Sequence, residues 1–200
     1  MDNPLDPVEL RVLGTLIEKE ATTPEYYPLS LNALVAACNQ KTNRWPVTEY
    51  TEGDVLSAIE ALKLRAYAAS ITGGSRVTKF AQRFTEKLNL GRRETAILCV
   101  LMLRGPQTVG EIKGRTERLY AFADLDETET VLHKMDTMIQ KLPHAPGTKE
   151  PRYAHTFGGT AEMPQAPAAH SSDRITALEA EVAQLREEVA ELRRRLDAVL

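Results

Sequence analysis

The chain has 200 residues, 42% of them hydrophobic and 26% charged, with a net charge of −3. This composition is that of a globular protein of one or two domains, and its acidic balance argues against a dedicated non-specific nucleic-acid binder. The sequence contains no apolar run of about 18 residues, as a membrane span requires, and no signal peptide. We therefore expect a cytoplasmic protein.

Three helices are predicted in the first third of the chain. Asp6, Ser30 and Thr51 are good N-cap residues, and each precedes a run in which apolar residues recur at helical spacing. The second of these helices should end at Asn39, because the six residues from Asn39 to Arg44 are all polar.

A β-hairpin should follow the third helix. Residues 66–72 and 77–84 have the composition of strands, and the Gly73-Gly74 pair between them is a hairpin turn signal. Three helices followed by a hairpin form a winged helix-turn-helix unit. We assign residues 1–88 to a first domain of this kind.

The same order of elements appears a second time. Residues 94–98 align with residues 9–13 at a shift of 85 positions, a weak match that the following elements reinforce. Thr108 and Glu111 predict a capping box at the start of one helix. A further helix is predicted from Asp126 to Lys141, with Met135 and Ile139 on its buried face, and a returning strand from Tyr153 to Phe157. We assign residues 89–157 to a second winged-helix domain.

The C-terminal residues have a different character. Residues 158–173 are rich in Gly, Pro, Ala and Ser, which predicts a disordered linker. Residues 174–200 show a heptad repeat with mostly β-branched residues at a and mostly Leu at d, the pattern of a parallel two-stranded coiled coil. We expect a homodimer; the alternative is an amphipathic helix that folds back on its own domain. The dimerisation residues would be Ile175, Leu178, Val182, Leu185, Val189, Leu192, Leu196 and Val199.

The predicted third helix of each domain is acidic. In the first domain this helix has more acidic residues (Glu52, Asp54 and Glu60) than basic ones. Residues 126–141 of the second domain also include more acidic than basic residues. The acids gather in the first turn, where they stabilise the helix dipole. That end normally meets the bases of DNA, so carboxylates there would repel phosphate and disfavour conventional DNA reading.

Basic and amide side chains elsewhere are candidate contacts for nucleic acid or a partner protein. For the polar loop two interpretations stay open: its side chains satisfy backbone groups at a helix end and in a turn, or they contact a ligand. The basic residues of the first wing and of the second domain are either phosphate contacts or a scattered solvated surface. The candidate set is Asn39, Gln40, Lys41, Asn43, Arg44, Arg76, Lys79, Arg83, Lys113 and Arg115.

No catalytic, cofactor or metal site is predicted. Cys38 and Cys99 each lie on the apolar face of a predicted helix, which favours buried free thiols. The four histidines lack metal-ligand spacing; a hairpin in the second wing would place His144 opposite His155, but one pair is weak evidence for a metal site. We find neither a nucleophile–base arrangement nor a glycine-rich phosphate loop, and expect no enzyme.

Four segments resemble a known family, the YceH-like family of uncharacterised bacterial proteins. They are TTPEYYPLSLNALVAACNQKTNR (residues 22–44), RVTKFAQRF (76–84), LMLRGPQTVGEIKGRT (101–116) and the terminal heptads. The resemblance implies tandem winged-helix domains over nearly the full length, and it carries over no catalytic residue. Trp45 and Val109 depart from the family pattern.

We thus expect a fold that is mainly α with small β-hairpins: two tandem winged helix-turn-helix domains plus a C-terminal coiled-coil helix. Two functions are compatible with it. The first is a DNA-associated transcriptional regulator, which the base rate for bacterial winged helices slightly favours. The second is a protein-interaction adaptor, which the acidic third helices favour; fold alone does not choose between them.

Overall fold

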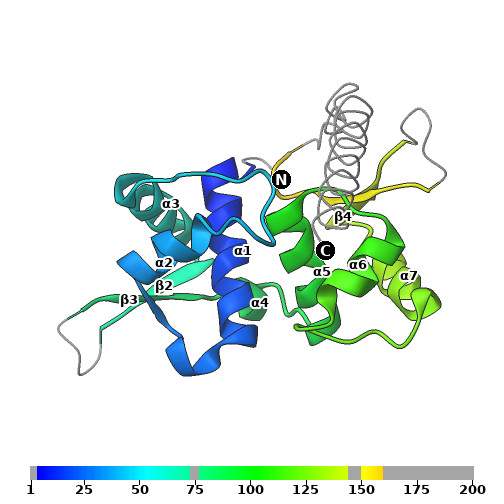
Figure 1. The fold of residues 1–200 in the computed structure, drawn as a ribbon, viewed down its shortest axis with the longest axis horizontal. Coiled ribbons are helices and arrows are strands. Elements are labelled where there is room, and N and C mark those ends of the chain that lie inside the picture. The colour runs from blue at the N-terminus through cyan, green and yellow to red at the C-terminus, as the bar shows by residue number, and fades with distance from the viewer. Residues whose placement is uncertain (1–3, 73–76, 144–149, 160–200) are drawn as a thin grey trace, which may run out of the picture. The chain divides into compact units, whose positions relative to one another are not determined.

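The computed structural model describes residues 4–72, 77–143 and 150–159, and these form a mainly helical fold with two small antiparallel sheets (Figure 1). Arg76, His144, all but the first two residues of the predicted linker, and the predicted coiled coil lie outside the described residues. The elements in chain order are α1 (Pro7–Thr22), η1 (Pro24–Tyr26), β1 (Leu29–Ser30), α2 (Leu31–Cys38), α3 (Glu52–Leu64), β2 (Ala68–Ile71), β3 (Lys79–Gln82), α4 (Phe84–Lys87), α5 (Arg92–Arg104), α6 (Val109–Thr116), α7 (Leu125–Lys134), β4 (Ile139–Lys141) and β5 (Tyr153–His155).

The starts of α1, α2, α3 and α6 are those that the sequence predicts, whereas α7 is capped by Asp124 and begins at Leu125 rather than at Asp126. Asp6, Ser30 and Thr51 each accept a hydrogen bond from the backbone N–H three residues later. Thr108 does the same for α6, and Glu111 closes that capping box. Gly105, at φ 70°, ends α5.

The N-terminal half (residues 4–88) contains a three-stranded sheet rather than a plain hairpin. β3 lies in the centre and pairs antiparallel with both β2 and β1. β1 is only two residues long, and its second residue, Ser30, is also the N-cap of α2. The sequence therefore does not predict a strand there. The predicted second strand is also too long, because Phe84 begins α4.

The predicted helix from Asp126 to Lys141 is wrong in its second part. α7 ends at Lys134, and Met135 is its C-cap. Ile139 then opens β4 and pairs with His155, which makes β4 the partner of the correctly predicted returning strand. Met135 and Ile139 are buried, as predicted; their spacing suits a helix and a turn-plus-strand equally well.

The helices α1 and α5 pack against each other and join the two halves (Figure 1). A Cβ on Gly14 would lie 3.0 Å from Leu103 Cδ2, so glycine permits the close approach. The Cys99 thiol donates to the Gly14 carbonyl oxygen, and these two positions are equivalent in the 85-residue repeat. Contact between equivalent positions is what an approximate twofold axis produces.

The two halves also share one hydrophobic core. Phe84 and Phe157 meet edge to face with ring centroids 5.0 Å apart, and both side chains are fully buried. The Leu5 backbone N–H donates to the Phe157 carbonyl at 2.7 Å, which ties the start of the chain to the end of the second sheet. No helix among the described residues is long and apolar enough to cross a membrane.

Candidate functional site

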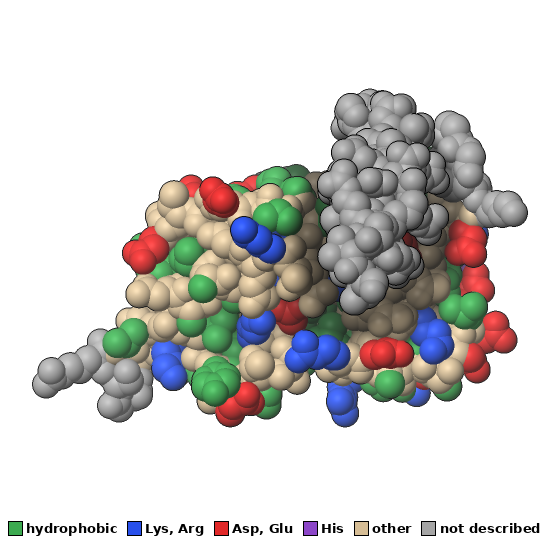
Figure 2. All heavy atoms as spheres, viewed as in Figure 1, with side chains coloured by type: hydrophobic (Ala, Val, Ile, Leu, Met, Phe, Trp, Pro, Cys, Tyr) green, Lys and Arg blue, Asp and Glu red, His purple; other side chains and the backbone are tan. Residues whose placement is uncertain are grey.

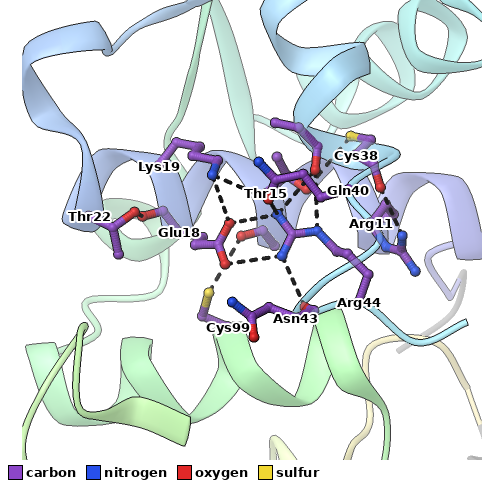
Figure 3. A network of polar contacts seen from close by, with 12 residues as sticks. Arg11, Thr15, Glu18, Lys19, Thr22, Cys38, Gln40, Asn43, Arg44 and Cys99 are labelled. Atoms are coloured by element: carbon purple, nitrogen blue, oxygen red, sulfur yellow. Dashed lines mark hydrogen bonds and ion pairs between the residues drawn. The ribbon is translucent and has the colours of Figure 1, made fainter. Parts of the chain in front are cut away.

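The polar loop after α2 folds inward, around Arg44 (Figure 3). The Arg44 side chain is fully buried and forms two hydrogen bonds with the Glu18 carboxylate, at 2.6 and 3.0 Å. It also donates to the Ala37 carbonyl, near the end of α2, and to the Gln40 side chain. Arg44 therefore anchors the loop to α1, and its guanidinium is not accessible to a partner in this conformation.

Glu18 stays ionised in this setting. Burial alone would raise its pKa, but the hydrogen bonds and charge of Arg44, together with the charge of Lys19, outweigh burial and hold the pKa below its ordinary value. The pair is thus a charge-assisted bidentate contact of the strong kind.

The amide side chains of the loop serve the fold as well. Asn39 bonds both the N–H and the carbonyl of Tyr50 at 2.8 Å, which closes the loop. Asn43, at φ 61°, accepts a hydrogen bond from Arg104 of α5. These contacts match the structural interpretation of the loop; among its candidates, Lys41 is exposed to solvent.

A second buried cation, Arg11 of α1, supports the same loop from the other side. Its guanidinium donates to the carbonyls of Cys38 and Pro46 at 2.9 and 2.6 Å and to the Thr48 hydroxyl. Burial lowers its pKa, and the nearby charge of Arg44 adds to that effect. The loop is therefore held between two arginines that face backbone carbonyls.

The polar loop lines a cleft of about 470 Å³ together with residues of α1, of α5 and of the end of α6. We call it the cation cleft, because its lining includes five basic side chains and a single carboxylate, Glu18. The basic residues are Lys19, Lys41, Arg104, Arg115 and Arg118.

A different groove lies between α3 and the β2–β3 hairpin. This α3–hairpin groove has a volume of about 760 Å³. Its lining combines the apolar side chains of Leu31, Leu56, Val77 and Phe80 with Glu60, Lys79 and small polar residues. Leu56 and Val77 are 42% and 55% exposed, so apolar surface faces solvent here.

The exposed face of α3 is as acidic as its sequence suggests. Glu52, Asp54 and Glu60 are exposed, and Lys63 forms an ion pair with Glu60 at 3.0 Å. The Asp54 carboxylate accepts hydrogen bonds from Thr51 that lower its pKa, so it remains charged. On the face in view, Figure 2 shows acidic and basic side chains interspersed rather than one broad basic patch.

The remaining candidate cations are spread over both halves. Lys79 lines the α3–hairpin groove, and Arg83 forms an exposed ion pair with Glu86 at 3.2 Å. Lys113 lies half-buried on α6, and Arg115 pairs with Glu111 at 3.4 Å. Of the described candidates, Lys41 and Arg115 come together at the cation cleft, which Gln40 and Asn43 also line.

Sequence reasoning missed Glu18, Lys19 and Arg104 as parts of this site. A signal for two of them exists, since Lys19 and Arg104 occupy equivalent positions in the 85-residue repeat. A basic residue near the end of a helix is ordinarily explained by the helix dipole. For this reason the two equivalent basic residues do not, from sequence alone, indicate a shared site. The contact between α1 and α5 was needed to place both at one cleft.

Neither thiol is placed for chemistry. Cys38 and Cys99 are free and buried, as predicted. Burial raises the pKa of Cys38 to about 11 and raises that of Cys99 as well, so both are protonated at neutral pH. Among the described residues, no group of three or more His, Cys, Asp or Glu is placed to hold a metal ion.

Comparison with known proteins confirms the resemblance found in the sequence. The model of the family described as "Protein of unknown function, DUF480" matches residues 5–148. A UPF0502 protein of Solibacter usitatus is 52% identical over 98% of this chain and 100% of its own length. UPF0502 proteins of Citrifermentans bemidjiense and Pelobacter propionicus are 49% and 46% identical, over 91% and 98% of this chain and 90% and 97% of their own lengths.

Proposed function

Because the chain belongs to the DUF480 family, whose members have no assigned function, we propose its role from its own geometry: a non-enzymatic adaptor that binds a protein segment in the α3–hairpin groove. The observation that carries the proposal is the character of the exposed surface of α3. This surface carries carboxylates and leucine side chains, whereas a helix that reads DNA carries basic and amide side chains.

We infer that each half is a winged helix. In the N-terminal half the order α1, α2, α3, β2, β3 supports this inference, with β1 added to the sheet. The order α5, α6, α7, β4, β5 supports it in the C-terminal half. In such a unit the third helix is the element presented to a partner, so the chemistry of α3 and α7 selects the partner.

The chemistry of α3 suits a protein segment. Leu56 and Leu64 are 42% and 91% exposed, and apolar side chains of this size are what a docking helix or strand buries. Glu52, Asp54 and Glu60 are exposed on the same helix, and Glu60 lines the same groove as Leu56. The expected occupant is therefore an apolar segment flanked by lysine or arginine, held by charge complementarity at the rim.

The second candidate, a DNA-associated regulator, is favoured by Lys79 on β3 and by the exposed Arg83, which lie on the wing that normally contacts the backbone. The inward fold of the polar loop counts against it, because Arg44 and the amides of Asn39 are engaged within the protein. The adaptor thereby becomes the better supported of the two.

Two measurements on the full-length chain separate the candidates. The first is fluorescence anisotropy with mixed-sequence duplex DNA from about 50 to 200 mM salt. The adaptor predicts no micromolar binding at the upper salt. Micromolar binding that Lys79→Gln/Arg83→Gln abolishes would overturn it in favour of the regulator.

The second measurement is photo-cross-linking in cells from a benzophenone side chain placed at position 56, with Thr130 of α7 as the matched exposed control position. The adaptor predicts one partner captured at position 56 and not at 130. The purified partner should then lose at least about tenfold in affinity for Leu56→Glu. A partner that binds Leu56→Glu unchanged would contradict the α3–hairpin groove as the site.

We also propose that the chain is a homodimer through its C-terminal heptads, which would present two grooves and raise the apparent affinity for a paired target. Replacing Val182 and Val189 with glutamate places charge at two a positions. The mass in light scattering should halve; an unchanged mass would contradict the coiled coil.

A further inference from the structure

We propose that the cation cleft is a binding site for a small organic polyanion, such as a phosphorylated metabolite. No residue lines both this cleft and the α3–hairpin groove, so the proposal stands apart from the adaptor function.

The charge balance of the cleft is the first argument. Five basic side chains line it, and Glu18, the single carboxylate of the lining, is shared between Arg44 at 2.6 Å and Lys19 at 3.5 Å. Arg115 has a partner in Glu111, which Arg152 shares at 2.7 Å. None of the ion pairs among the described residues involves Lys41, Arg104 or Arg118.

Helix dipoles account for only part of this charge. Lys19, Arg104 and Arg115 lie in the last turns of α1, α5 and α6, where a cation is favourable. Each helix end carries the equivalent of about half a negative charge, so three ends offset about one and a half of the five cations. Lys41 in the polar loop and Arg118 beyond α6 have no helix end of their own.

The cations also lie close enough to repel one another. Burial lowers the pKa of Arg104, and the charges of Arg115 and Arg44 lower it further, beyond what Glu18 compensates. Such a gathering of like charges is unfavourable in the empty protein and becomes favourable when an anion occupies the cleft.

The size and lining of the cleft specify the kind of anion. A volume of about 470 Å³ is in the range of sites for small organic molecules. Val100, Leu103 and Leu119 add apolar surface to one wall. Guanidinium groups bind phosphate or carboxylate through paired hydrogen bonds, so the ligand should carry two anionic groups on a compact organic body.

The site spans both halves of the protein. Lys19 and Lys41 belong to the N-terminal half, whereas Arg104, Arg115 and Arg118 belong to the C-terminal half. A bound polyanion would therefore link the halves across α1 and α5, and binding should raise the thermal stability of the whole chain.

Isothermal titration calorimetry of the full-length protein with pyrophosphate and with citrate, at about 150 mM salt, tests the proposal. We expect at least one of them to bind with a Kd below about 1 mM. Lys41→Gln/Arg118→Gln should weaken that binding at least about tenfold. Both side chains are exposed and form no hydrogen bond or ion pair with the other described residues, so this variant should fold normally.

The matched control is Arg83→Gln/Lys134→Gln, which removes two exposed positive charges away from the cleft. Its affinity for pyrophosphate or citrate should equal that of the unaltered protein. Absence of binding by both probes, or equal losses in the two variants, would overturn the proposal. So would duplex DNA binding that the cleft variant abolishes while neither probe binds, since the cleft would then be a nucleic-acid surface.

Discussion

The two halves of the chain repeat one order of elements but fill their interiors differently. All of the charged residues that are buried in the described part of the chain, Glu9, Arg11 and Arg44, belong to the N-terminal half. The C-terminal half buries an entirely apolar run on α5, from Ala96 to Leu103, and its ion pairs, such as that of Arg93 with Glu127, are partly exposed.

The connection between the second and third helices explains this difference. In the N-terminal half, residues 39–51 connect α2 and α3. Arg11 and Arg44 donate hydrogen bonds to backbone carbonyls of this connection and of the end of α2. In the C-terminal half, residues 117–124 make the shorter connection between α6 and α7. A long irregular segment needs partners for its backbone groups, and buried guanidinium groups supply them.

The C-terminal half has its own unmet polar groups, and these are neutral. Gln107 Oε1, Gln140 Nε2, Tyr153 OH and His155 Nδ1 are buried without a hydrogen-bond partner. All four lie on or beside the β4–β5 sheet. We therefore expect that removing a buried charge destabilises the N-terminal half, whereas adding a buried charge destabilises the C-terminal half.

Arg44→Met should have the largest effect. It leaves the Glu18 carboxylate, whose side chain is 14% exposed, without its bidentate partner and with only Lys19 at 3.5 Å. Breaking a buried pair in this way typically costs about 3–5 kcal/mol, and urea denaturation should show a loss of that size. Glu18→Gln/Arg44→Met should recover part of the loss, because neither position of the pair then carries a charge.

The surface pair of the C-terminal half is the control. Arg93 is 51% exposed and lies 3.1 Å from Glu127. Arg93→Met should therefore cost much less stability than Arg44→Met. Equal losses for Arg44→Met and Arg93→Met would show that the two halves do not differ in the way described.

Protonation of His155 should have the next largest effect. Burial lowers the pKa of His155 to about 4 from its ordinary 6.5. The unfolded chain therefore takes up a proton below pH 6.5, whereas the folded chain does not until about pH 4. Stability is thus full above pH 6.5 and falls with pH, by about 2–3 kcal/mol between pH 6.5 and 4.5.

Urea denaturation across this pH range measures the effect. His155→Gln should flatten the slope, and His133→Gln, which alters an exposed histidine of α7, should leave it unchanged. Because carboxylates titrate mainly below this window, a slope that persists in His155→Gln would assign the pH dependence to another group.

Gly14→Ala tests the crossing of the two halves. The new Cβ would lie 3.0 Å from Leu103 and 3.1 Å from Met102, so side chains must shift. Overpacking of this kind costs about 1–3 kcal/mol, from which the better helix propensity of alanine recovers about 1. Gly114→Ala in α6 has open space around it and should instead stabilise by about 0.5–1 kcal/mol.

Sequence patterns predicted the helices well because caps and apolar spacing are local signals. Thr51 with Asp54 and Thr108 with Glu111 form capping boxes at α3 and α6, as expected. The end of α7 was missed, since Met135 and Ile139 continue a helical spacing while the chain turns into β4. Only the pairing with β5 decides between the two structures.

The candidate sites were less predictable, because they depend on contacts between distant segments. Arg44 lies in a polar stretch that predicts a surface loop. In the structure it is buried, because it binds Glu18, which is 26 residues earlier in the chain. Lys19 and Arg104 are 85 positions apart and line one cleft only because α1 packs on α5. No local pattern encodes that proximity.

Ala66→Gly should have the smallest effect and the opposite sign. Ala66, just after α3, has φ 54°, a left-handed conformation that costs a non-glycine residue about 1–2 kcal/mol. In the C-terminal half, α5 instead ends in Gly105 at φ 70°. Glycine also gains about 0.4–1 kcal/mol of entropy in the unfolded chain, so the net gain in stability should be only about 0.5 kcal/mol.

Asn89→Gly is the comparison for that variant. Asn89 has φ 51°, but asparagine tolerates the left-handed region, so its replacement should change stability little or lower it slightly. Differential scanning calorimetry of the two variants side by side resolves a difference of this size as a shift of about 1–3 °C in Tm. If Ala66→Gly lowers Tm as much as Asn89→Gly does, unfolded-state entropy outweighs the strain at Ala66, and the end of α3 is no weaker than that of α5.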